Sequence, residues 1–252
     1  MNHPFDLTGK RILVTGASSG IGRSVAVECS KMGAELILLG RNEERLIETL
    51  GKLSGENHCY AIFDFSNKND FEGLNELVSK HGKLNGLVHC AGITSTLPIK
   101  SINDERLKTA FESNVFGAFE LTKWFTKKSV INEVGASIVF IASVMGEVGE
   151  VGKSLYSMTK GALISGSKSM ALELAPRKIR VNCISPGVVL TPMVENGVYA
   201  NDEKLFQKVK DLHPLGLGNT EDIANSVIFL LSNASQWITG SNLIVDGGYT
   251  AH

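Results

Sequence analysis

The chain has 252 residues, of which 43% are hydrophobic, and its formal net charge is −1. This length allows one α/β domain or two smaller ones, and the apolar content is ample for a large core. The nearly balanced charge argues against a nucleic-acid binder. The first residues lack the basic and apolar segments of a signal peptide, and no apolar stretch reaches the roughly 18 residues of a membrane span.

The cysteines and histidines indicate no metal centre. Cys29, Cys59, Cys90 and Cys183 are scattered and form no C-x-x-C pair. Neither a disulfide framework nor a zinc site is therefore predicted, and the histidines have no ligand pairing. We expect His89, on an apolar run, to be a core histidine. A reducing cytoplasm is the expected compartment.

A glycine-rich turn follows the first predicted strand. The apolar run 11–14 predicts a short buried strand, and a helical pattern extends from Arg23 to about Met32. A turn of this kind lets the backbone approach a pyrophosphate, and the helix N-terminus supplies N–H groups and a positive dipole end. An ordinary turn with small residues is the alternative. We predict a dinucleotide site made by Gly16, Ser18, Ser19, Gly20, Ile21 and Gly22.

The second predicted strand bears on the choice of cofactor. It covers 35–39 and is followed by Gly40, Arg41 and Asn42. An acidic residue at this strand end would bind an adenine ribose and repel a 2′-phosphate. Here a glycine stands at that position, and the guanidinium of Arg41 can clamp a phosphate. We therefore expect NADP(H) in preference to NAD(H). Asn42 and the hydroxyls of Ser18 or Ser19 are weaker candidates, and an Arg41 that only meets solvent is the alternative.

Short apolar runs alternate with longer amphipathic stretches along the whole chain. Continuous apolar strands are typical of a sheet covered on both faces, and strand–helix alternation predicts a parallel, doubly wound sheet. No linker, internal repeat or low-complexity segment divides the chain, so a single α/β domain over 1–252 is predicted. The seven runs are 11–14, 35–39, 59–63, 86–90, 137–142, 180–184 and 242–245.

Three residues in the second half form a candidate catalytic set. Lys160 follows Tyr156 by four residues, and Ser143 precedes the tyrosine by thirteen. Positions i and i+4 share one helix face, so the ammonium can stabilise a phenolate and lower the tyrosine pKa. A serine hydroxyl nearby could hold the carbonyl oxygen that the phenol protonates. The alternative for the tyrosine and the lysine is a solvated helix face.

Two segments border this set. The segment 188–213 leaves a strand through Pro186-Gly187 and has no strong periodicity, so we predict a lid over the ligand crevice, with a peripheral helical pair as the alternative. The glycine- and valine-rich stretch 144–155 predicts an open, mildly apolar pocket floor. Its polar residues Glu147, Glu150 and Lys153 are expected to face solvent, with substrate contact as the alternative.

Taken together, these pieces resemble the short-chain dehydrogenases and reductases of about 250 residues. The match includes Thr15–Gly22, Asp64, Ala91-Gly92, Asn114, Ser143, Tyr156, Lys160, Pro186-Gly187, Ile238-Thr-Gly and Asp246-Gly-Gly. The resemblance implies a Rossmann-like fold with helices on both faces of the sheet. One departure is Cys90, where the family has an asparagine that braces the strand beside the cofactor. We expect a local cost in stability, because a thiol is a weaker hydrogen-bonding group.

The resemblance also implies roles for residues. Tyr156 protonates the carbonyl oxygen, Ser143 orients it, and Lys160 reaches the nicotinamide ribose and depresses the tyrosine pKa. Asn114, expected in a helix from about Leu107 to Thr126, links Lys160 to solvent through its backbone carbonyl and a water. The further cofactor contacts implied are Asp64 and Phe65 at the adenine, Ala91 and Gly92 at the ribose, and Pro186, Gly187, Val189 and Thr191 near the nicotinamide.

Substrate and assembly are less tightly constrained. Among relatives, the pattern is most similar to 3-oxoacyl-carrier-protein reductases, in which basic residues dock an acidic carrier; Arg177 and Lys127-Lys128 are the candidates here. A sugar, polyol, steroid or other small ketone is the alternative substrate. An NAD-dependent alcohol dehydrogenase and a non-catalytic cofactor-binding protein are alternative functions. The resemblance and the apolar residues of 107–126 predict a homotetramer.

Overall fold

The structure is a computed structural model that describes residues 3–64, 71–195 and 203–251. Within these residues, seven strands form one sheet in the order β3-β2-β1-β4-β5-β6-β7. Every neighbouring pair is parallel. The strands are β1 (Arg11–Thr15), β2 (Glu35–Gly40), β3 (Cys59–Ile62), β4 (Gly86–His89), β5 (Ala136–Ile141), β6 (Ile179–Pro186) and β7 (Asn242–Val245).

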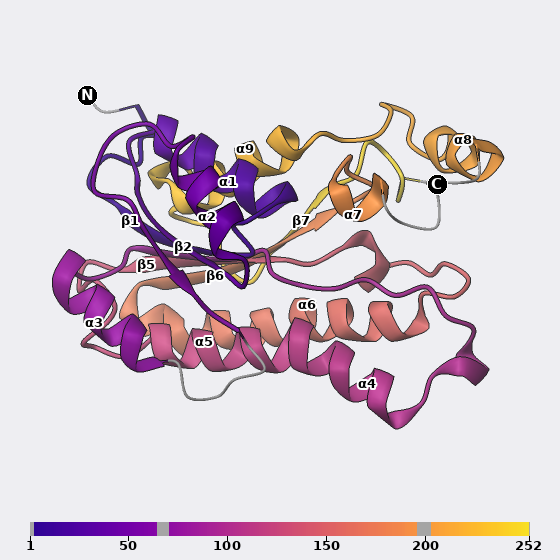
Figure 1. Ribbon diagram of the computed structural model, residues 1–252, viewed down its shortest axis with the longest axis horizontal. Coiled ribbons are helices and arrows are strands. Elements are labelled where there is room, and N and C mark those ends of the chain that lie inside the picture. Colours follow the sequence, from indigo (N-terminus) through magenta and orange to yellow (C-terminus); the bar gives the residue numbers. More distant parts are fainter. Residues whose placement is uncertain (1–2, 65–70, 196–202, 252) are drawn as a thin grey trace.

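Helices cover both faces of this sheet (Figure 1). One layer contains α1 (Gly20–Lys31), α2 (Glu43–Leu50) and α9 (Thr220–Leu231), and the other contains α3 (Phe71–His81), α4 (Asp104–Phe111), α5 (Gly117–Phe125) and α6 (Ser154–Leu174). Two further helices, α7 (Pro192–Glu195) and α8 (Glu203–Asp211), follow β6. The predicted parallel, doubly wound α/β fold is confirmed.

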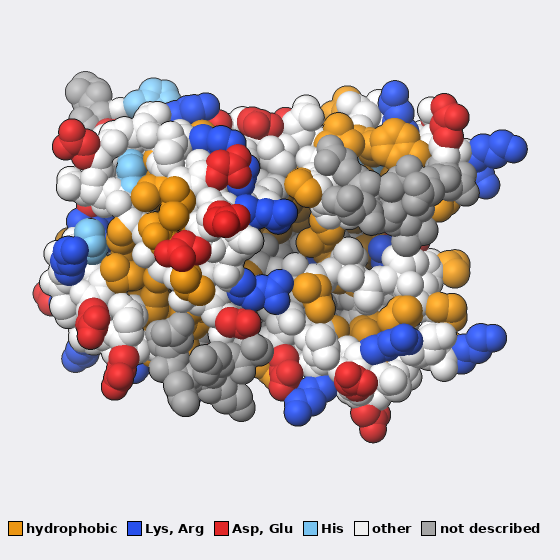
Figure 2. Space-filling view, in the orientation of Figure 1, with side chains coloured by type: hydrophobic (Ala, Val, Ile, Leu, Met, Phe, Trp, Pro, Cys, Tyr) orange, Lys and Arg blue, Asp and Glu red, His pale blue; other side chains and the backbone are white. Residues whose placement is uncertain are grey.

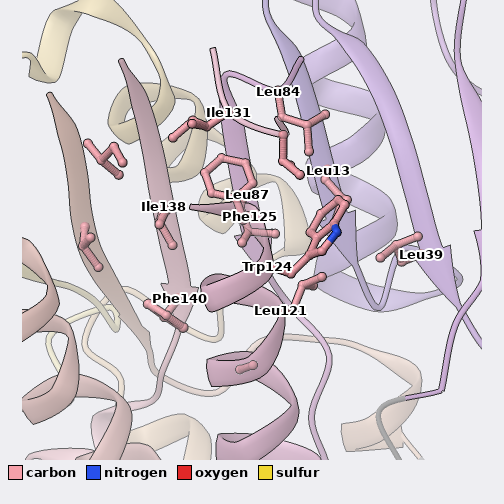
Figure 3. Packing of buried hydrophobic residues seen from close by; sticks show 14 of the residues in the cluster. Leu13, Leu39, Leu84, Leu87, Leu121, Trp124, Phe125, Ile131, Ile138 and Phe140 are labelled. Atoms are coloured by element: carbon pink, nitrogen blue, oxygen red, sulfur yellow. The ribbon is translucent and has the colours of Figure 1, made fainter. Parts of the chain in front are cut away.

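The strands are apolar because both of their faces are buried. In β2, Ile37 and Leu39 belong to one buried cluster, whereas Leu36 and Leu38 belong to the cluster on the opposite face. This alternation follows from the two-residue period of a strand. Figure 3 shows the first cluster, in which side chains of α5 meet those of β1, β4 and β5; its labelled members include Leu13, Leu87, Leu121, Trp124, Phe125 and Ile138.

The strand order places a crevice where ligands bind in folds of this class. β1 lies between β2 and β4, so the chain leaves neighbouring strands toward opposite layers at this point. In open parallel sheets, ligands bind at such a switch point, outside the carboxyl ends of the strands. The glycine-rich turn after β1 and the Ala91-Gly92 segment after β4 both lie at this edge.

The helix predicted over 107–126 is interrupted. α4 ends at Phe111, a π-helical turn spans Glu112–Phe116 (η2), and α5 begins at Gly117. Asn114 lies in this turn and is buried. The extra residue of a π turn shifts the helix register locally, and such turns are frequent at functional sites.

Within the described residues, no helix is both long enough and apolar enough to cross a bilayer, and no cluster of His, Cys, Asp or Glu could hold a metal ion.

Candidate active site

Two glycines make the turn after β1 possible. Gly16 has a φ of +65°, and a Cβ there would lie 2.9 Å from the backbone nitrogen of Ala91. A Cβ on Gly22 would overlap the carbonyl oxygen of Gly16. A side chain at either position is therefore excluded by backbone, which is the condition for close approach of a ligand to the chain.

The first turn of α1 leaves its N–H groups without a side-chain cap. Ser19 is the N-cap residue, and its side chain makes no capping hydrogen bond. The first N–H groups of a helix have no partner within the helix, and together with the dipole they form an anion site. The glycine turn and this helix start fit the pyrophosphate of a dinucleotide, as predicted for Ser18, Ser19, Gly20 and Ile21.

The segment after β4 is held against this turn by Thr15. The buried Thr15 hydroxyl accepts hydrogen bonds from the backbone N–H groups of Cys90 and Ala91, each at 3.1 Å. Ala91 and Gly92 therefore lie beside the glycine-rich turn. With Cys90 in place of an asparagine, the brace of this backbone comes from the threonine on the neighbouring strand.

The residues expected at the adenine end lie beside the same turn. A Cβ on Gly40 would lie 3.5 Å from the Cβ of Ser18, so the end of β2 adjoins the glycine turn. Arg41 follows and is exposed. Asn42 is the N-cap residue of α2. Its side-chain oxygen accepts a hydrogen bond from Arg45 N at 2.9 Å and so caps the helix. Asp64 is half-buried just beyond β3, and Phe65 lies outside the described residues.

A cavity of about 860 Å³ opens at the carboxyl edge of the sheet. Its outline is visible in Figure 2 as an indentation between the end of the molecule that carries α8 and the segment before α4. Of the residues predicted for the site, those that line the cavity are Ile21, Gly92, Ser143, Tyr156, Lys160, Pro186, Gly187, Val189 and Thr191. The structure thus brings the catalytic set and the predicted nicotinamide contacts to one cavity.

Ser143 and Tyr156 are joined in this cavity. Ser143 follows β5, and its hydroxyl is hydrogen-bonded with the Tyr156 phenol while it accepts from Met145 N at 3.1 Å. The expected fall in the tyrosine pKa is wrong for this state of the chain. Burial raises the pKa of Tyr156 to about 12, and the hydrogen bond with Ser143 offsets this only in part. The phenol is therefore protonated at neutral pH.

The Lys160 ammonium donates to a backbone carbonyl and lies over the Tyr156 ring, and in this arrangement it does not lower the pKa of the phenol below its usual value. The Nζ donates to the carbonyl oxygen of Ile141 at 2.8 Å and lies 5.6 Å from the centre of the Tyr156 ring. A Cβ on Gly92 would lie 3.7 Å from this Nζ, so the lysine reaches the β4 loop. Burial lowers the pKa of Lys160 to about 8.

Asn114 is buried and is not among the residues that line the cavity, and its side-chain amide is hydrogen-bonded. The amide donates to the carbonyl of Ile93 at 2.9 Å and to the Thr159 hydroxyl at 3.0 Å, and its oxygen accepts from Ile93 N at 2.8 Å. Asn114 thereby joins the π turn, the β4 loop and α6. Thr159, which sequence reasoning missed, is buried on α6 immediately before Lys160.

The segment 188–213 contributes the outer wall of the cavity. Met193 and Val194 of α7 and Leu205 and Val209 of α8 line it, and residues 196–202 lie outside the described part of the chain. His213 fastens the base of α8, because its Nε2 accepts from Val188 N at 3.1 Å and its Nδ1 donates to Val209 O at 2.7 Å. This histidine had no sequence signal of its own.

The expected positions of other polar residues need correction. Lys153, expected to face solvent, is buried in the cavity wall, whereas Glu147 and Glu150 are exposed and only the second lines the cavity. The sequence signal for Lys153 was its spacing, since it precedes Tyr156 by three residues and is the N-cap of α6. Arg177 donates to the carbonyl of Thr126 at 2.6 Å, beyond the far end of α6.

The 21 residues of α6 span about 30 Å, so Arg177 and Lys127-Lys128 lie far from Tyr156 of the same chain. His89 is a core residue, as expected. It stacks on Phe140 with ring centres 4.6 Å apart, and its Nε2 bonds Thr122 at 2.9 Å.

Comparisons with known proteins place the chain among dehydrogenases and reductases. A family model described as enoyl-(acyl carrier protein) reductase matches residues 16–250. A 3-oxoacyl-[acyl-carrier-protein] reductase of Rickettsia felis is 39% identical, covering 97% of this chain and 98% of that protein. L-xylulose reductase of Mus musculus is 34% identical over the same shares, 97% and 98%.

Solved structures are similar along the whole chain. A short-chain type dehydrogenase/reductase from Mycobacterium ulcerans has a TM-score of 0.87 at 30% identity, covering 98% of this chain and 92% of that one. An Agrobacterium tumefaciens protein, provisionally assigned as a 2-deoxy-D-gluconate 3-dehydrogenase, contains bound NADP; it has a TM-score of 0.86 at 28% identity, with both chains covered fully, at 100%.

Proposed function

The chain belongs to the short-chain dehydrogenase/reductase family, and from this premise we propose that it reduces a ketone to a secondary alcohol with NADPH. The family makes it an NAD(P)-dependent oxidoreductase. The observation that carries the finer proposal is that Ser143, Tyr156 and Lys160 line one cavity beside the glycine-rich turn. A nicotinamide bound there supplies the hydride.

The protonation of Tyr156 suits the reducing direction. At neutral pH the phenol holds a proton that it can give to the oxygen of the carbonyl as negative charge develops there. Burial, which raises its pKa to about 12, opposes this transfer, and the nearby ammonium of Lys160 favours it. The Ser143 hydroxyl, already hydrogen-bonded with the phenol, is placed to share that oxygen and orient it. Tyr156 is thus the general acid of this proposal, and Ser143 the orienting donor.

Lys160 and Asn114 are proposed to assist proton transfer from Tyr156. We assign Lys160 to the nicotinamide ribose, because its Nζ lies between the β4 loop and Ile141. An ammonium there favours the phenolate that remains after proton transfer. Asn114 holds Thr159 and the β4 loop, and its backbone carbonyl is assigned to a water-mediated proton path toward Lys160.

The preference for NADP(H) follows from the end of β2. Gly40, which adjoins Ser18, presents no carboxylate to repel a 2′-phosphate, and the exposed Arg41 follows it. The bound NADP of a similar solved structure supports this choice. Asp64 and Phe65 are assigned to the adenine, and Ala91 and Gly92 to the ribose.

Replacement of Arg41 tests the cofactor assignment. Arg41→Ala is expected to raise the KM for NADPH about tenfold, or about 1.4 kcal/mol, because the phosphate loses its guanidinium partner. The KM for NADH should stay as it is, and Arg106→Ala, an exposed arginine on α4, is the matched control. An equal change for both cofactors would remove the assignment.

The segment 188–213 is proposed to be the substrate lid. Four apolar residues of α7 and α8 form the cavity wall opposite the catalytic set, and they suit a medium-sized, partly apolar ketone. A 3-oxoacyl thioester is one candidate, on the name of the Rickettsia relative, and a sugar ketone is another, on the name of the mouse relative.

We also propose a cytoplasmic homotetramer. The four cysteines are unpaired, which suits a reducing compartment. Large apolar side chains are exposed on η2, α5 and α6, including Phe116, Phe119 and Leu172. Apolar faces of this kind favour symmetric association.

A substrate panel tests the reaction itself. Purified protein is mixed with NADPH or NADH and a series of ketones, 3-oxoacyl thioesters and sugar ketones, and oxidation of the cofactor is followed at 340 nm. The proposal predicts turnover of at least one ketone with NADPH favoured. Tight NADPH binding without turnover of any carbonyl, and without oxidation of any alcohol in the reverse assay, would contradict it.

A further inference from the structure

Lys153 is a buried cation in the wall of the catalytic cavity. Only 9% of the residue is exposed, and it lines the same cavity as Tyr156, which follows it by three residues. Lys153 is the N-cap residue of α6, and Tyr156 lies in the first turn of that helix. The lysine and the proposed acid therefore line one cavity from the N-terminal end of α6.

The hydrogen-bond partner of this ammonium carries no charge. Among the described residues, its Nζ donates one hydrogen bond, to the Thr96 hydroxyl at 2.7 Å. An ammonium has three donors, and burial of a charge is costly unless an opposite charge or several hydrogen bonds compensate. Thr96 also lines the cavity, so the pair faces the space that a substrate would fill.

Charges around Lys153 do not remove this cost. The Glu150 carboxylate attracts the ammonium, but burial is the larger effect and the pKa of Lys153 stays below its usual value. Glu150 itself is exposed, whereas the lysine is not. Lys208 of α8 lines the cavity as a further cation. Among the described residues that line the cavity, three lysines (Lys153, Lys160 and Lys208) thus outnumber the one acidic residue, Glu150.

We propose that Lys153, oriented by Thr96, binds a carboxylate of the substrate, so that the preferred substrates are oxo acids with a free carboxylate. This inference rests on the proposed ketone reduction and names its substrate class. A carboxylate would form a charge-assisted hydrogen bond with the remaining donors of the ammonium. Lys153 then determines specificity, because a neutral ketone of the same shape offers no charge to the remaining donors of the buried ammonium, whose acidic neighbour Glu150 is exposed.

Matched acid and ester substrates test the proposal. We would compare kcat/KM for acetoacetate with that for methyl acetoacetate, and for levulinate with methyl levulinate, since the two pairs differ in the distance from ketone to carboxylate. The wild-type protein should prefer the acid in at least one pair. Lys153→Met should lower the acid-to-ester ratio of that pair at least tenfold, mainly through the KM of the acid.

Three further variants separate specificity from stability. Lys168→Met removes an exposed lysine from the same helix and should leave the ratio as it is. Thr96→Val should lower the ratio in the same direction as Lys153→Met but less, because the lysine loses only its orienting partner. Lys153→Arg should recover part of the preference. NADPH binding, followed by fluorescence titration, shows that each variant is folded.

Two results would overturn the proposal. One is a wild-type protein that turns over the esters as well as or better than the acids. The other is a folded Lys153→Met protein with the wild-type ratio, as expected if the lysine only ties α6 to the β4 loop. If no ketone is turned over, the proposed function fails, and thermal melts with NADP⁺ still test Lys153. Acetoacetate or levulinate should raise the Tm of the wild type and not of Lys153→Met; equal shifts would reject the carboxylate site.

Discussion

Burial acts on the protonation of Tyr156 and Lys160 in opposite directions. It raises the pKa of the phenol to about 12 and lowers the pKa of the ammonium to about 8. In each case the charged form is the one that burial disfavours. The phenol keeps its proton at neutral pH, while the lysine is a buried cation whose ammonium donates to the carbonyl of Ile141.

Lys160 should therefore reduce the stability of the ligand-free chain. Its pKa is about 8 when folded, against a usual 10.5, so below pH 8 the folded state bears the full cost of the charge. Lys160→Met should raise the free energy of unfolding by about 1 to 3 kcal/mol at pH 7, after loss of the hydrogen bond to Ile141 is counted. Urea unfolding at pH 7 measures this change.

The pH dependence provides the control. Between pH 8 and 10.5 the unfolded chain still binds the proton more tightly, so the cost falls as pH rises and vanishes above 10.5. The advantage of Lys160→Met should shrink to less than about 1 kcal/mol at pH 10. Lys168→Met, on the exposed face of α6, should change stability little at either pH. A variant less stable than wild type at pH 7 would show that the buried charge is fully compensated.

At the scale of elements, the turn from β1 into α1 depends on two glycines that backbone alone encloses. Gly22→Ala would place a Cβ on the carbonyl oxygen of Gly16. We expect destabilisation by about 1 to 3 kcal/mol, because overpacking against backbone forces the turn to move, together with a rise in the Kd for NADPH. Gly51→Ala is the matched control, since a Cβ there comes no closer than 3.6 Å to other atoms.

Thermal unfolding and fluorescence titration of both variants decide this point. A Gly22→Ala protein that unfolds and binds NADPH like the wild type would mean that the turn has room for a Cβ at this position. An equal loss in Gly51→Ala would mean that the effect belongs to alanine in a helix end and not to the cradle.

Much of this architecture could be predicted from periodicity. All seven apolar runs are strands, and strand–helix alternation was enough to predict the parallel sheet. The π turn at Glu112–Phe116 could not be predicted in this way. Its residue Asn114 is hydrogen-bonded to Ile93 and Thr159, which are remote in sequence. Local patterns carry no information on such contacts.

The candidate site shows the same difference between what local sequence patterns predict and what depends on remote contacts. Ser143, Tyr156 and Lys160 were found from spacing, yet the direction of the tyrosine pKa was wrong, since it depends on burial and on where the lysine points. Lys153 looked like a solvated charge for the same reason. Thr15 and His213 contact backbone groups, and Thr159 contacts the Asn114 amide, and only the fold brings these partners near.

At the scale of the whole molecule, one layer of helices presents apolar side chains to solvent. Phe116 and Phe119 are 55% and 53% exposed, and Met158 and Leu172 of α6 are 47% and 79% exposed. Burial of such side chains in a subunit interface removes apolar area from water and stabilises the assembly by roughly 25 cal/mol per Å². These residues are the ones on which the proposed tetramer should depend.

Phe119→Glu tests this interface. The side chain is exposed within one chain, so its replacement should leave the fold intact while it places a charge in the contact. Light scattering should give a tetramer mass for wild type and a smaller species for the variant. Trp237→Glu, at a fully exposed residue (100%) remote from α5, is the comparison that locates the effect. A wild-type monomer, or a Phe119→Glu tetramer of unchanged stability, would contradict the assignment.

The central claim is that the Tyr156 phenol gives its proton to a ketone, and that the NADPH which reduces this ketone binds at the glycine-rich turn. The most direct measurement is kcat of Tyr156→Phe with NADPH and the best ketone of the panel, beside a fluorescence titration of NADPH. The account predicts a kcat lower by about two to four orders of magnitude, with the Kd for NADPH within about twofold of wild type. Turnover near the wild-type rate in a folded, NADPH-binding Tyr156→Phe protein would contradict it.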